Sequence, residues 1–100
     1  MQPDYPQVFE RDTGGTEAEW RMRLPGACGV RRLAFEGEQA ARVSFDGGSL
    51  RLQWRSLPPR RIALMTMPRL AVRFEFDGVA DAERERFMRY FDLYMQRGGG

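Results

Sequence analysis

The chain contains no histidine, no lysine and only one cysteine among its 100 residues. Histidine is the side chain that most often moves protons near neutral pH, so its absence removes the commonest general base and a frequent metal ligand. Without lysine there is no Schiff base, and the lone Cys28 can form neither an internal disulfide nor a zinc pair. Because Cys28 has no histidine partner, we interpret it as a structural thiol. We therefore expect no enzymatic activity, no catalytic residues, no metal site and no cofactor.

The chain also lacks the long apolar runs that membranes and export require. No stretch approaches the ~20 apolar residues of a membrane-spanning helix. Residues 1–10 have neither the basic start nor the apolar run of a signal peptide. We expect a cytoplasmic protein without a membrane partner, and a single cysteine fits a reducing compartment.

All 16 cations are arginines, and 14 carboxylates leave a net charge of only +2. Asparagine is absent as well, while arginine, glycine and alanine are abundant, a composition that a GC-rich, bacterial type of genome imposes. The preference for arginine is therefore interpreted as codon usage rather than as selection for phosphate recognition. Because the net charge is modest, we do not expect a nucleic-acid partner.

Alternating apolar and polar residues predict a β-rich chain. The alternation is regular over residues 18–24, 41–45, 50–55 and 70–77, and less regular strands are predicted over 30–36 and 61–66. Apolar residues on both faces of 61–66 suggest that this strand is covered twice. Asp46-Gly47 separates two alternating runs and predicts a hairpin, since the turn needs a positive φ that glycine adopts without steric cost.

The period then changes from 2 to 3.6, and residues 80–97 are predicted to form a helix with Phe87, Phe91 and Tyr94 on its apolar stripe. We expect an α+β fold of about six antiparallel strands in a strongly curved sheet or partial barrel, with this one C-terminal helix packed on it. Residues 1–16 are expected to form a loosely ordered N-terminal arm, 17–97 a single domain and 98–100 a frayed glycine tail.

Two sets of residues are candidates for binding. Arg21, Arg23, Arg51 and Arg73 fall on the polar side of their predicted strands and would share one exposed face, where an anion could bind. Glu19 and Glu75 have the same parity and favour a solvated face of mixed charge. Tyr90 lies at the edge of the helix's apolar stripe and Leu93 on its polar side, and both are candidates for a partner contact.

These observations favour a small, non-catalytic binding or adaptor module that acts through protein contacts, made by the helix edge or an exposed strand. The partner protein is unidentified, and a homodimer is an open alternative. A second hypothesis is a small-ligand binder that holds an apolar or anionic, nucleotide-like molecule between sheet and helix. An enzyme ranks third.

Overall fold

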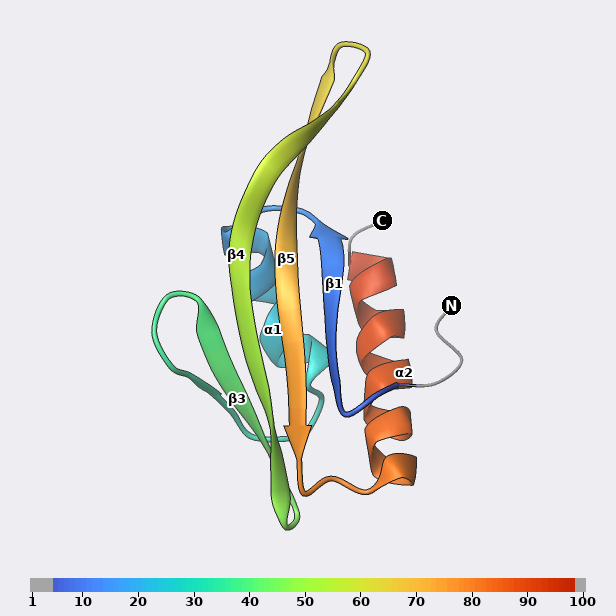
Figure 1. The fold of residues 1–100 in the computed structure, drawn as a ribbon. Helices are drawn as coiled ribbons and strands as arrows, with labels where there is room; N and C mark the ends of the chain where they lie inside the picture. The colour runs from blue at the N-terminus through green and yellow to red at the C-terminus, as the bar shows by residue number, and fades with distance from the viewer. Residues whose placement is uncertain (1–4, 99–100) are drawn as a thin grey trace.

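A computed structural model describes residues 5–98 as an open, two-layer α+β fold (Figure 1). The five strands form one antiparallel sheet in the order β1-β5-β4-β3-β2, so the sheet has two free edges and is not closed. Both helices pack on the same face. In chain order the elements are β1 (Val8–Gly14), α1 (Glu17–Ala27), β2 (Leu33–Phe35), β3 (Ala40–Phe45), β4 (Gly48–Ile62), β5 (Met65–Asp77) and α2 (Asp81–Gly98).

The prediction of a strand over residues 18–24 is wrong, because this segment is helix α1. Trp20 and Leu24, the buried residues of that run, are four apart and fit both a strand and a helix template. A capping box decides for the helix: the Thr16 hydroxyl accepts from the Glu19 backbone N–H, and the Glu19 carboxylate accepts from the Thr16 backbone N–H. The Thr16 backbone N–H and the Thr16 hydroxyl both donate to the Glu19 carboxylate, and these bonds hold the pKa of Glu19 below its ordinary value.

The hairpin at Asp46-Gly47 is confirmed, with φ = 80° at Gly47. The separate strand predicted over residues 61–66 is wrong. β4 continues through Pro58-Pro59, with a register shift between Leu57 and Arg60, and turns back at Ala63-Leu64 into β5. Residues 5–98 consequently form five strands and two helices, where the sequence predicted six strands and one helix.

The N-terminal segment is more ordered than the expected loose arm, since Val8–Gly14 pair with β5 as strand β1. Tyr5 is buried, its hydroxyl donates to Asp92 Oδ2 at 2.8 Å, and Arg11 donates to both oxygens of the same carboxylate. These hydrogen bonds hold the segment that contains Tyr5 and Arg11 against α2. Residues 1–4 and the end of the predicted glycine tail, 99–100, lie outside the described residues.

Aromatic side chains fill the space between the sheet and the helices. Phe91 of α2 lies within 5.9 Å, between ring centroids, of both Trp20 on α1 and Phe74 on β5. Phe87 is also buried, as the helical stripe predicts, and so is the neighbouring Met88, whereas Tyr94 is 37% exposed. The packed core leaves the opposite sheet face, hereafter the outer face, turned toward solvent.

Candidate functional site

The outer face of the sheet carries rows of polar residues that the strand register sets side by side. One row runs Ala40, Gln53, Arg73 and Glu10, and the next contains Arg55, Ala71 and Asp12. Arg51 and Arg73 lie on this face, as their predicted parity requires. Arg21 and Arg23 do not, because they belong to α1. Arg21 instead donates to the carbonyls of Gly37 and Glu38.

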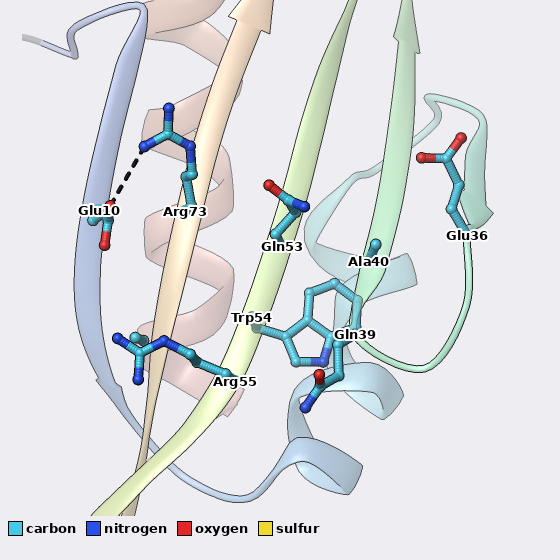
Figure 2. A pocket seen from close by; sticks show the side chains of 9 residues that line it. Glu10, Glu36, Gln39, Ala40, Gln53, Trp54, Arg55 and Arg73 are labelled. Atoms are coloured by element: carbon cyan, nitrogen blue, oxygen red, sulfur yellow. Dashed lines mark hydrogen bonds and ion pairs between the residues drawn. The ribbon is translucent and has the colours of Figure 1, made fainter.

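A shallow hollow of about 560 Å³ lies over these rows (Figure 2). Ala40 and Ala71 contribute only methyl groups, so the longer side chains around them form its rim. Arg55 and Arg73 supply positive charge, and Glu10 and Glu36 supply negative charge. Trp54 contributes little, because its ring is buried on the helix side. The hollow can therefore offer both hydrogen-bond donors and acceptors to a polar molecule.

Several arginines on the outer face are paired with nearby carboxylates. Arg73 lies 3.4 Å from both Glu10 and Glu75, and Arg42 lies 3.1 Å from Glu36. Arg51 and Arg55 have no ion pair within the described part of the chain. Two unpaired cations are few for a duplex-binding surface, which uses many phosphate contacts. The electrostatics thus fit a solvated face of mixed charge better than a nucleic-acid platform.

The second candidate surface is the projecting end of the β4–β5 hairpin, residues 57–68, hereafter the arm. β3 pairs with β4 as far as Gln53, and β1 pairs with β5 as far as Arg69, so the hairpin continues alone beyond them (Figure 1). All residues from 58 to 68 are exposed. The base is braced by Arg69, which donates to the Pro58 carbonyl at 2.8 Å and contacts Asp12 at 2.5 Å.

Large apolar side chains cover the arm. Leu64 at its tip is 102% exposed, and Met65, Ile62 and Met67 are 63%, 54% and 44% exposed. Paired residues of an antiparallel ladder point to the same side, so the register Ile62↔Met65 groups these two on one face. A cluster of exposed apolar side chains on a projecting hairpin is typical of an interaction site. The sequence did not reveal this surface. A strand with apolar residues on both faces has the same sequence pattern whether those faces are buried or exposed.

The arm also belongs to a strongly basic part of the chain. Residues 47–74 contain six arginines and no aspartate or glutamate. The remaining residues hold ten arginines against 14 carboxylates, a net charge of −4. Arg61 on the arm has no ion pair among the described residues, and Arg60 lies 4.0 Å from Asp12. This segregation of charge was readable from the sequence and is the signal that could have identified the arm.

The predicted contact residues on α2 are exposed in the structure. Tyr90 and Leu93 are both about half exposed, and Val30, after α1, is fully exposed. A hollow of about 330 Å³ lies between Tyr90 and the turn that holds Gly29 and Val30. The helix edge is therefore a third, smaller candidate surface, separate from the outer face and the arm.

The remaining chemistry-bearing groups are dispersed. Cys28 is buried, and this burial raises the pKa of its thiol to about 12. Such a thiol carries almost no thiolate near neutral pH. Among residues 5–98, no three cysteine, aspartate or glutamate side chains gather so that they could hold a metal ion. Neither described helix is long and apolar enough to cross a membrane.

Comparison with known proteins adds no assignment to these surfaces. No protein family model matches the chain, and a search of curated proteins finds no significant match.

Proposed function

We propose that this chain is a non-catalytic binding module that contacts a protein partner through the arm. The observation that carries the proposal is the exposed apolar set at the arm tip, centred on Leu64. Burying one such side chain contributes about 1.5–3 kcal/mol, so a few of them can supply the core of a specific contact.

The prolines of the arm favour recognition by side chains over addition of another strand. Pro58 and Pro59 lie in β4 and Pro68 in β5, beyond the last pairings with β3 and β1. Proline has no backbone N–H to donate to a neighbouring strand, and prolines commonly protect free strand edges from pairing. A partner is therefore expected to receive Leu64 and its neighbours in an apolar pocket.

A photo-crosslinking residue in place of Leu64 should trap the partner in an extract of the cells that express the protein. The purified partner is then titrated with the wild-type chain, with Leu64→Ser/Met65→Ser, and with the control Val8→Ser/Met22→Ser. The control removes two exposed apolar side chains that lie outside both the arm and the hollow beside Tyr90. We expect at least tenfold weaker binding for the arm variant alone, a loss of about 1.4 kcal/mol.

Normal binding by the arm variant would refute the proposal. If Tyr90→Ala or Leu93→Glu abolished binding in its place, the helix edge would be the contact surface.

A second candidate function is supported by the hollow of the outer face, whose rim holds Arg73, which is paired with Glu10 and Glu75, and Arg55, which has no ion pair among the described residues. Two guanidinium groups at the rim suit a small anionic, nucleotide-like ligand. Titration with a cyclic dinucleotide should then shift the amide resonances of Gln53 and Arg55, and Arg55→Gln should abolish the shifts. Unperturbed spectra at millimolar ligand would remove this candidate.

A further inference from the structure

The free edges of the sheet are not equally protected against pairing with another strand. Prolines protect the arm, as described above. On β1, an antiparallel self-pairing about Arg11 would set Glu10 opposite Asp12 of a second copy, and like charges in opposite positions are destabilising. The other edge of the sheet is β2, beside β3 in Figure 1, and Leu33–Phe35 contains neither proline nor charge.

The hydrogen bonds between β2 and β3 show which backbone groups of β2 remain unpaired. The Arg32 carbonyl accepts a hydrogen bond from β3 at 2.9 Å, and the Glu36 N–H donates one to β3 at 2.8 Å. In an antiparallel strand, the backbone groups of successive residues point to opposite sides. Those of Leu33 and Phe35 therefore point to the free edge, where no strand of residues 5–98 pairs with them. Such a row of donors and acceptors can take a further strand.

We infer that β2 pairs with β2 of a second copy of this chain, antiparallel about Ala34, so that the two sheets become continuous. In this register Leu33 of each copy lies opposite Phe35 of the other. Both residues direct their backbone groups to the free edge, so each pair can exchange two N–H···O bonds. The twofold axis passes between the two Ala34 residues and repeats every contact.

The apolar side chains of β2 favour this register. Leu33 packs against the core, and Phe35, two residues later, lies on the same side of the strand, under the Arg21 guanidinium of α1. Phe35 is 39% exposed in a single copy, and an opposite Leu33 would cover part of it. Ala34 falls in the position without hydrogen bonds, where opposite Cα atoms approach to about 4.5 Å and a small side chain fits.

The charged residues that flank β2 are compatible with the same register. Arg32 of each copy comes opposite Glu36 of the other, on the outer face of the sheet, where Figure 2 shows Glu36 at the sheet edge. Glu36 already lies 3.1 Å from Arg42 within its own chain. The flanking charges therefore help to select the register, whereas the backbone and apolar pairs hold the contact.

The same surface is used by both copies, so the contact is isologous and closes at two copies. An unrelated strand would match β2 on one side only by chance, whereas this pairing repeats each match by symmetry. The contact lies at the β2 edge and leaves the arm of each copy free. It goes beyond the proposed function and does not depend on it.

Sedimentation velocity of the full chain tests the inference. The average mass should rise from 11.6 kDa toward twice this value, and not beyond it, at protein concentrations up to about 1 mM. Phe35→Pro removes an N–H that points to the free edge and spares the bonds to β3, since prolines are accepted at such positions. The control Phe35→Ala removes the ring and keeps the N–H. We expect Phe35→Pro to associate at least tenfold more weakly than Phe35→Ala.

Charge exchange at Ala34 identifies the register. Ala34→Glu and Ala34→Arg each set like charges opposite one another and should weaken association at least tenfold, and an equimolar mixture of the two should restore it. Ala34 is exposed, so both variants should fold. Ala82→Glu and Ala82→Arg make the same changes at an exposed position of α2 and should associate as the wild type does.

A wild-type chain that stays monomeric, equal association of Phe35→Pro and Phe35→Ala, or a mixture of the Ala34 variants that fails to reassociate would each overturn the inference. A monomeric chain that pairs β2 with a foreign strand would overturn it as well. Leu64→Ser/Met65→Ser should dimerise normally, because the arm is not part of this contact. The proposed function fails separately, when a partner trapped at position 64 binds that arm variant as tightly as the wild type.

Discussion

Phe91 on α2 packs against aromatic residues of both α1 and β5, so its truncation is the most informative test of the fold. The side chain is 1% exposed, and its ring centroid lies 5.9 Å from Trp20, 5.5 Å from Phe74 and 5.8 Å from Phe87. Phe91→Ala removes a buried ring and leaves a cavity, which typically costs about 3–5 kcal/mol. A chain of this length has about 5–15 kcal/mol of total stability, so the variant should be marginally folded.

Urea denaturation followed by tryptophan fluorescence measures this loss, because both tryptophans, Trp20 and Trp54, are buried. With a slope near 1.5 kcal/mol per molar urea, a loss of about 4 kcal/mol lowers the midpoint by about 2–3 M. Phe91→Leu keeps most of the volume and should stay folded if Phe91→Ala does not. Tyr94→Ala, one turn later and 37% exposed, is the control and should cost clearly less. Equal losses for Phe91→Ala and Tyr94→Ala would refute the packing of α2 on the sheet.

Three further predictions concern the turn, the thiol and the N-terminal cluster. Gly48→Ala should cost more than Gly47→Ala: at Gly47 only the positive φ opposes a side chain, at about 1 kcal/mol, whereas a Cβ at Gly48 would clash with the Asp77 carbonyl oxygen and lie 2.6 Å from the Gly78 carbonyl carbon. Comparison of their denaturation midpoints checks the order, and a reversed order would contradict it. Cys28 should react with a thiol reagent at about pH 8 only after denaturant is added, because its pKa is raised to about 12 and it is buried; rapid labelling of the native protein would show that the site opens. Burial, and then the bond to Asp92, raise the pKa of Tyr5, so its contribution to stability is complete below the unfolded pKa of about 10 and is lost as the pH rises through the folded value. Tyr5→Phe should lower the unfolding free energy by about 1 kcal/mol near neutral pH and reduce its decline above about pH 10, and an unchanged alkaline profile would count against the Tyr5–Asp92 bond.

Local sequence patterns correctly predicted those strands and helices whose surroundings in the folded protein match the pattern. Residues 41–45 and 50–55 alternate on either side of Asp46-Gly47, and the structure pairs them as a hairpin. The 3.6-residue period identified α2 and the burial of Phe87 and Phe91. The α+β class and the antiparallel sheet follow from these elements, because period and turn chemistry are local properties.

Only the tertiary structure decided between patterns that are locally ambiguous. Trp20 and Leu24 fit two periods, and the Thr16–Glu19 capping box together with packing against Phe91 makes their segment a helix. Arg21 and Arg23 consequently lie on helix α1, whereas Arg51 and Arg73 lie on the outer face of the sheet, as predicted. Val8–Gly14 became a strand because β5 offers a free edge to pair with.

The arm shows the same limit most clearly. The sequence by itself determined that residues 47–74 are basic and that the predicted strand 61–66 has apolar residues on both faces. It also placed Tyr90 at the edge of the helical stripe and Leu93 on the polar side of the helix. Whether an apolar strand is buried on both faces or exposed on both depends on which elements lie beside it, and that information is not local. Because β1 and β3 end before the hairpin does, Ile62, Leu64 and Met65 project into solvent, where they form the binding surface proposed for this protein.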